Sequence, residues 1–194
     1  MYYLGIMTPI KPDQITSLEE RCWSFVEERI PGIRKGCGAP AYVHSQRVFL
    51  LLKELGFSEE VCVGGLLHDV IEDAGITIEE LKALGCTQRM IDLVLLATQD
   101  DEYERGDTQW VMLLAQLIKA DDIEEWSIKI ADILDNIRSC LSMSPERRRF
   151  MHQVKGPLFY SLVKKKPVKK ELLELLQQAV QEGLDQEQKL SQKK

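Results

Sequence analysis

The chain has 194 residues, a length that suits one ordinary domain. Its 31 acidic residues outnumber its 25 basic ones, and the net charge of −6 argues against a protein that mainly neutralises nucleic-acid phosphates or an anionic membrane. With 44% hydrophobic and 29% charged residues, the composition is typical of a folded soluble domain and not of a disordered chain.

The distribution of proline and of apolar residues predicts helices along the chain. All seven prolines lie outside residues 41–144, and a proline costs ~3 kcal/mol in a helix interior. Apolar residues recur at helical spacing, and no alternation of period two is found. We therefore expect an all-α fold, a compact multi-helix bundle with an extra C-terminal helix. The expected helices cover residues 17–30, 43–55, 58–75, 77–84, 87–97, 107–119, 121–141, a segment that begins at Ser144-Pro145, and residues 169–190.

A lysine-rich run at residues 164–170 precedes the last expected helix. Such a run is usually a solvated linker, so we expect a domain over residues 1–166 and a C-terminal helical extension over residues 167–194. Apolar residues of the extension fit either closure of the core or a homo-oligomer interface, and we favour the core. These residues are Leu172, Leu173, Leu175, Leu176 and Val180.

The five cysteines are scattered and form no C-x-x-C pair, which is typical of free thiols in a reducing compartment. The first ten residues contain no basic residue and no long apolar run, so no secretory signal is expected. The longest central run of apolar residues and glycine, residues 61–67, is too short to span a membrane. We therefore expect a cytoplasmic protein whose partner is neither a membrane nor a nucleic acid.

Four potential ligand side chains interrupt the apolar stretch Gly-Gly-Leu-Leu-His-Asp-Val-Ile-Glu-Asp at residues 64–73. On one helix, His68 lies one turn from Glu72, and Asp69 lies one turn from Asp73. Burial of charged groups beside leucine and isoleucine is costly unless a metal or a strong partner compensates them. The segment therefore predicts either a salt-bridged helix end or part of a metal site.

Two further polar residues favour the metal site. His44 lies at the start of the second expected helix, and Asp132 interrupts the apolar helix over residues 121–141. Two imidazoles with two carboxylates suit a first-row divalent cation such as Mn²⁺ or Fe²⁺, whereas a closed structural zinc site usually includes cysteine. The third histidine, His152, is interpreted as a surface or packing residue.

The order His44, His68-Asp69, Asp132 resembles that of the HD superfamily of metal-dependent phosphohydrolases. More narrowly, His-Asp-x-x-Glu-Asp together with Lys-x-Ala-Asp-x-x-x-Asn resembles the hydrolase domain of stringent-response enzymes and small alarmone hydrolases. The resemblance covers residues 20–142 and implies an all-α HD-domain bundle. It also implies a small-molecule nucleotide substrate, guanosine 3′,5′-bispyrophosphate (ppGpp).

The resemblance further implies roles for individual residues. A divalent cation, with Mn²⁺ favoured, would lower the pKa of a bound water that attacks the phosphorus, and the catalytic pair Glu72 and Asp73 would activate and position that water. The implied metal ligands are His44, His68, Asp69 and Asp132. The expected substrate-binding residues are Arg34, Lys35, Asn136 and Ser139, with Lys129 as a further donor to the phosphoryl oxygens.

The sequence departs from the family pattern in the loop before His44, where Ala41 also replaces a tyrosine, and at Asp135. The loop over residues 34–44 is one residue longer, and Asp135 stands where the family commonly has a histidine. A carboxylate there would repel a polyphosphate if it faced the cleft. We favour a ppGpp 3′-pyrophosphohydrolase. The alternatives are an HD phosphohydrolase for another nucleotide, such as a 5′-nucleotidase, and a non-catalytic metal-binding regulatory module.

Overall fold

The computed structural model of the chain describes residues 17–34, 38–98 and 107–192. Within these ranges the regular structure is helical, and the single extended contact is an antiparallel bridge between Ile33 and Pro40. The all-α prediction is confirmed. No helix within these ranges has both the length and the apolarity that a bilayer crossing requires. Lys35, an expected substrate-binding residue, lies outside the described residues.

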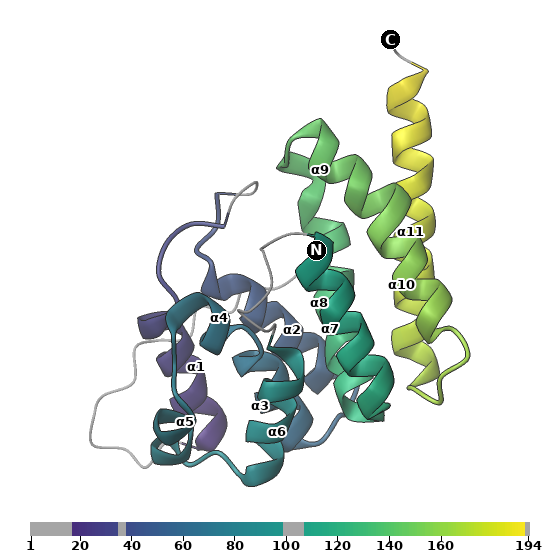
Figure 1. The fold of residues 1–194 in the computed structure, drawn as a ribbon. Helices are drawn as coiled ribbons and strands as arrows, with labels where there is room; N and C mark the ends of the chain where they lie inside the picture. The colour runs from purple at the N-terminus through teal and green to yellow at the C-terminus, as the bar shows by residue number, and fades with distance from the viewer. Residues whose placement is uncertain (1–16, 35–37, 99–106, 193–194) are drawn as a thin grey trace.

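The helices divide into an earlier and a later set along the chain. The earlier set is α1 (Leu18–Arg29), α2 (Tyr42–Glu54), α3 (Glu59–Leu67), α4 (Val70–Ala74), α5 (Ile78–Leu84) and α6 (Gln88–Ala97). The later set is α7 (Asp107–Ala120), α8 (Ile123–Ser139), α9 (Pro145–Arg149), α10 (Gly156–Val163) and α11 (Lys170–Ser191). A 3-10 turn over Cys140–Ser142 follows α8, and a π-helical turn over Phe150–Lys155 joins α9 to α10. Figure 1 shows α1 to α6 on one side of α8, with α10 and α11 on the other.

Several helix boundaries follow local signals in the sequence. Ser17 and Thr77 each accept a hydrogen bond from the backbone three residues on, and the glutamate there bonds back to the cap. Complete capping boxes therefore begin α1 and α5. Gly75 and Gly85 adopt left-handed conformations, with φ of 64° and 100°, and end α4 and α5.

Two of the expected helices are interrupted. The segment predicted as one helix over residues 58–75 forms α3 and α4, with a break at His68 and Asp69, and Asp69 has φ −101° and ψ −3°. The helix that begins after Ser144 widens into the π-helical turn, a form that accommodates one extra residue per turn. Each interruption contains a buried histidine, His68 in the first and His152 in the second.

Two clusters of buried apolar side chains form the core, and α8 contributes to both. Ile128 and Ala131 belong to the cluster that α1 to α6 complete. Ile130 and Ile133 belong to the cluster that also contains side chains of α7, α10 and α11. Because both sides of α8 are covered, residues 125–135 are all buried, and the charged residues among them are buried too.

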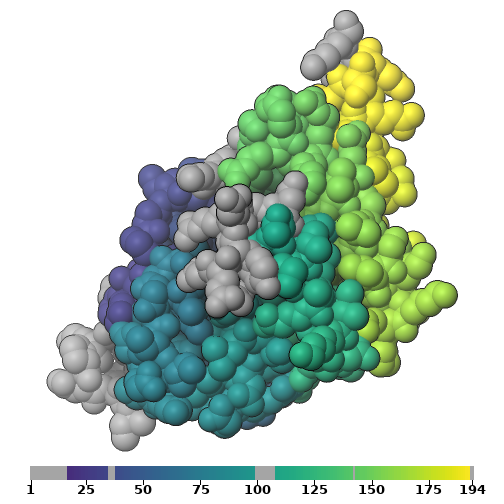
Figure 2. Space-filling view, in the orientation of Figure 1, coloured from purple at the N-terminus to yellow at the C-terminus, as the bar shows by residue number. Residues whose placement is uncertain are grey.

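The C-terminal helix α11 completes the second cluster. Leu172 and Leu176 are fully buried there, so the apolar face of α11 closes the core. The last turns of α11 project beyond the other helices (Figure 2).

A buried polar chain connects α8 to α11 through the π-helical turn. Sγ of Cys140 lies 3.1 Å from Nε2 of His152, whose Nδ1 lies 3.1 Å from Oε1 of Glu187. Arg148 donates to the two oxygens of that carboxylate at 2.6 and 3.3 Å. Burial raises the pKa of the Cys140 thiol to about 11, which is typical of a structural cysteine and not of a nucleophile. His152 is therefore a packing residue.

Glu125 is a buried acid with an unusual environment. It lies in the first turn of α8 and is 1% exposed, and neither carboxyl oxygen has a hydrogen-bond partner in the described part of the chain. Burial raises its pKa from 4.5 to about 8, although the charges of Lys129 and His68 act in the opposite direction. At neutral pH the folded protein therefore keeps the proton on Glu125.

We predict that Leu176→Ala lowers the free energy of unfolding by ~2–5 kcal/mol, because it leaves a cavity between α8 and α11. Urea denaturation followed by circular dichroism measures this quantity. The matched control is Leu158→Ala on α10, where the leucine is 44% exposed, and its cost should stay near ~0.5 kcal/mol. Equal losses for the two variants would show that α11 is not part of the core.

We predict that Glu125→Gln gains stability relative to wild type as the pH rises from 5 to 8. Between pH 4.5 and about 8 the unfolded chain releases a proton that the folded protein keeps, so the stability of the wild type falls through this window. The relative gain should be on the order of a few kcal/mol at pH 8. Urea denaturation of the metal-free proteins at several pH values measures it.

The control for this experiment is Glu171→Gln, which alters an exposed glutamate in the first turn of α11. It should follow the wild type at every pH. A difference between Glu125→Gln and wild type that does not change with pH would contradict a proton held on Glu125.

Candidate metal centre

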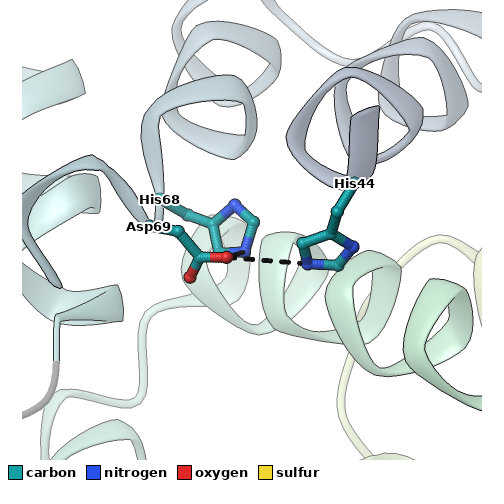
Figure 3. A group of neighbouring side chains, drawn as sticks. All are labelled: His44, His68 and Asp69. Carbon is teal, nitrogen blue, oxygen red and sulfur yellow. Dashed lines mark ion pairs between the residues drawn. The ribbon is translucent and has the colours of Figure 1, made fainter. Parts of the chain in front are cut away.

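Three separate parts of the chain bring four ligand-type side chains together. His44 lies in the first turn of α2, and Asp132 lies in the middle of α8. His68 and Asp69 lie at the break between α3 and α4. Figure 3 shows the two imidazoles and the Asp69 carboxylate pointing toward one another. The Asp69 side chain is 29% exposed whereas the other three are buried, so solvent reaches the cluster beside Asp69.

The facing atoms converge on one point. Nε2 of His44 lies 3.1 Å from Oδ1 of Asp132 and 3.7 Å from Oδ2 of Asp69. Nε2 of His68 lies 3.1 Å from Oδ2 of Asp69 and 3.9 Å from Oδ1 of Asp132. Ligands that share one cation at ~2.0–2.2 Å lie at separations of this size. His44, His68 and Asp69 thus form one group whose ligand atoms face one another, and Asp132, the fourth predicted ligand, lies beside both imidazoles.

The break after Leu67 allows two adjacent residues to face the same point. Consecutive residues of a continuous helix lie ~100° apart around its axis, so their side chains diverge. At the break, Nδ1 of His68 turns back to the carbonyl oxygen of Gly65 at 2.8 Å, and Asp69 begins the turn into α4. A His-Asp pair at a helix break thus supplies two ligands where a straight helix would supply one.

The charges of the cluster are strongly coupled. Burial alone lowers the pKa of a histidine, but Asp132 and Asp135 together outweigh it and raise the pKa of His44. For His68, the charge and hydrogen bond of Asp69, together with the charge of Asp132, outweigh burial and raise the pKa to about 9. Burial alone raises the pKa of a carboxyl group, yet His68 holds that of Asp69 at about 2, and Lys129 holds that of Asp132 well below its usual range. The cluster therefore attracts positive charge.

Nε2 of His68 indicates that a cation fits this cluster. The atom is buried and makes no hydrogen bond within the described residues, although a carboxylate oxygen of Asp69 lies 3.1 Å away. Because Nδ1 donates to the Gly65 carbonyl, Nε2 is the ring atom that faces the cluster, and a bound cation would take there the place of the proton that the raised pKa favours. Two imidazoles and two carboxylates form a donor set that suits a first-row divalent cation.

Two predicted nucleotide contacts hold Asp132 in place. Nζ of Lys129 lies 2.7 Å from Oδ2 of Asp132, and Nδ2 of Asn136 donates to Oδ1. The three residues lie at helical spacing on α8, so the helix presents them on one face. Lys129 is 6% exposed, which leaves its ammonium group bound to the ligand carboxylate.

Arg34 reaches the cluster from the segment between α1 and α2. Its guanidinium group donates to Oδ2 of Asp135 at 2.9 Å and to Oδ1 of Asn136. Asp135 is only 9% exposed, and Arg47 also donates to it. The Asp135 charge, which would repel a polyphosphate from an open cleft, is therefore compensated by two guanidinium groups.

The remaining predicted residues lie around this centre. Glu72 and Asp73 lie in α4, directly after the ligand Asp69, and Glu72 is half-buried while Asp73 is exposed. Ser139 lies at the end of α8, two turns beyond Asp132, and its Oγ is buried without a hydrogen-bond partner within the described residues.

Sequence reasoning missed Lys155, which the π-helical turn carries toward the centre. Its Nζ lies 5.4 Å from the ring centroid of Trp110. Burial and the charge of Lys129 lower its pKa to about 8, against the attraction of Asp132, Asp69 and other carboxylates. Nothing in its sequence neighbourhood distinguishes this lysine from those of the lysine-rich run, and only the fold brings it close.

Comparisons with known proteins identify the family of the chain. The HD domain family model matches residues 22–168, more than half of the chain. A probable guanosine-3′,5′-bis(diphosphate) 3′-pyrophosphohydrolase from Synechocystis is 32% identical over 136 residues, which cover 66% of this chain and 17% of that protein. The bifunctional (p)ppGpp synthase/hydrolase SpoT of Escherichia coli is 27% identical over 150 residues, with 74% and 21% covered. The chain thus spans about a fifth of these relatives.

A solved structure supports the same fold. It is a metazoan ortholog of SpoT, described as hydrolysing ppGpp, with a TM-score of 0.72 and 21% sequence identity. The match covers 87% of this chain and 97% of that one. An all-helical bundle, a His-Asp pair at a helix break, and a family match over residues 22–168 lead to one conclusion. The chain belongs to the HD domain family.

Proposed function

We propose that the chain is a metal-dependent phosphohydrolase that removes pyrophosphate from the 3′ position of ppGpp. The observation that carries the proposal is the convergence of two imidazoles and two carboxylates on one point, with two further acidic residues directly after it. Relatives whose names state this activity are similar to about two thirds of the chain, and the HD domain match over residues 22–168 contains the centre. The substrate is assigned from those relatives.

In this proposal, His44, His68, Asp69 and Asp132 hold a divalent cation, with Mn²⁺ as our choice. When bound, the cation supplies Lewis acidity toward the phosphoryl group and toward water. Lys129 and Asn136 keep Asp132 oriented and, with Arg34, Lys35 and Ser139, form the nucleotide side of the site. Lys155 adds a positive charge near the phosphoryl oxygens, where negative charge develops during the reaction.

Proton transfer falls to the acidic pair that follows Asp69. Glu72 is half-buried in the first turn of α4, the helix that Asp69 begins, so its carboxylate is partly shielded from bulk water. We assign Glu72 to accept a proton from the attacking water, and Asp73, which is exposed, to position that water. Transfer of this proton to the departing 3′-oxygen of the ribose would complete the exchange, leaving pyrophosphate and guanosine 5′-diphosphate.

A second candidate is hydrolysis of another nucleotide by the same centre. The observation that favours it concerns Arg34, which the resemblance assigns to the guanine and ribose. Both terminal nitrogens of Arg34 are engaged by Asp135 and Asn136, and this leaves the guanidinium group less free to contact a base. A site with this arrangement suits a nucleotide recognised mainly through its phosphates.

We further propose a cytoplasmic enzyme with a small-molecule substrate and no nucleic-acid partner. The net charge of −6 and the free cysteines of the described residues support this proposal. We also propose residues 1–166 as the catalytic domain and residues 167–194 as its C-terminal extension, held by leucines of α11. Association into a homo-oligomer stays a prediction, and light scattering, which measures the mass in solution, would test it.

We predict that purified protein with Mn²⁺ releases pyrophosphate from ppGpp, and much less product from nucleoside monophosphates, triphosphates or NADPH. Chromatography of the products measures each reaction, and the control is His68→Ala, which removes a ligand and should abolish turnover. Phosphate released from monophosphates alone would assign the second candidate. No turnover of any member of the panel would overturn the proposed hydrolase and favour a binding module.

We predict that Glu72→Gln lowers kcat by ~10²–10⁴-fold, because an amide cannot accept the proton, while Mn²⁺ affinity stays within twofold of wild type. Steady-state kinetics and calorimetric titration with Mn²⁺ separate the two effects. The matched control is Glu79→Gln, which alters an exposed glutamate in the first turn of α5 and should change neither. Unchanged kcat for Glu72→Gln would remove this residue from the mechanism.

A further inference from the structure

Asp135 contacts the edge of the His44 ring that faces away from the ligand cluster. Oδ2 of Asp135 lies 2.6 Å from Nδ1 of His44, while Nε2 of the same ring faces Asp132 and Asp69. Asp135 lies on α8, three residues after Asp132. Two residues of one helix therefore contact the two opposite edges of the His44 ring.

The Asp135 carboxylate is kept ionised by its surroundings. Oδ2 also accepts from Arg34 at 2.9 Å, and Arg47 donates to both oxygens at 2.5 and 3.0 Å. With guanidinium donors on both of its oxygens, the carboxylate offers the His44 ring acceptor atoms only. An ionised carboxylate only accepts hydrogen bonds, so Nδ1 of His44 carries the hydrogen.

We propose that Asp135 is a positioning residue of the metal centre, which orients the His44 ring and fixes its hydrogen on Nδ1 so that the Nε2 lone pair faces the cation. The inference rests on the metal centre of the proposed function and does not depend on which nucleotide is the substrate. A carboxylate behind a ligating imidazole also makes the ring a better donor.

The two arginines make the buried carboxylate tolerable. Arg47 lies on α2, one turn after His44, and Arg34 comes from the segment that the Ile33–Pro40 bridge closes. An uncompensated charge at this depth would cost several kcal/mol. Arg34 and Arg47 therefore serve the metal centre indirectly, by keeping Asp135 charged and in place.

The experiment is calorimetric titration of the metal-free proteins with Mn²⁺ alone, which needs no substrate. We expect Asp135→Asn to weaken Mn²⁺ binding by ~10- to 100-fold, the usual effect of losing such a partner. The matched control is Asp122→Asn, which removes an arginine-paired carboxylate at the start of α8, away from the centre, and keeps a residue that caps the helix. Its Mn²⁺ affinity should equal that of wild type.

A second variant separates orientation from charge. Asp135→Glu keeps the negative charge beside both arginines but moves the acceptor relative to Nδ1 of His44, so we expect weaker Mn²⁺ binding here as well. Wild-type affinity in Asp135→Glu would assign the effect to charge and overturn the proposal. This variant also provides the test if Asp135→Asn does not fold, which circular dichroism of the metal-free protein would show.

Failure of this proposal is distinguishable from failure of the proposed function. Wild-type protein that binds no Mn²⁺ would overturn the metal centre itself and, with it, the role of Asp135. Wild-type binding together with unchanged affinity in Asp135→Asn would overturn the role of Asp135 alone.

Discussion

Compensation of buried charge on α8 is the constraint on which the rest of the structure depends. Apolar clusters cover both sides of this helix over residues 125–135, so the charges of Lys129, Asp132 and Asp135 are shielded from bulk water and must be balanced by neighbours. Lys129 balances Asp132 within the helix, and arginines from outside balance Asp135. The segment before α2 and the helix α2, both distant from α8 in the sequence, therefore contact α8 through these arginines. The same demand for positive charge makes the centre suited to a cation.

Most of the fold could be predicted because its signals are local. Capping boxes at Ser17 and Thr77 and left-handed glycines at 75 and 85 mark helix ends without reference to the rest of the chain. The break between α3 and α4 could not be predicted. His68 and Asp69 are not helix-breaking residues, and the helical spacing of apolar residues continues through them. It depends on the bond from His68 to the Gly65 carbonyl and on contacts with distant helices.

The residues of the candidate site also divide into those that could be predicted from the sequence and those that could not. His44, His68 and Asp132 could be picked out because such residues are conspicuous in apolar helices. Asp135 and Arg47 are ordinary charged residues at ordinary helical positions, and 88 residues of sequence separate these two partners. The one usable signal is helical spacing from a ligand: Asp135 lies three residues after Asp132, and Arg47 lies three residues after His44. Lys155 offers none, because a turn in a different helix brings it to the centre.

The dispersal of the four ligands along the sequence couples the cation to folding. An unfolded chain does not hold residues 44, 68, 69 and 132 together, so a cation that needs all of them binds the native state and not the unfolded one. By linkage, each tenfold rise in free cation above its dissociation constant adds ~1.4 kcal/mol to the free energy of unfolding. Metal supply therefore acts as a stability variable for this protein. A cell that withdraws the cation would reduce the amount of folded protein as well as its turnover.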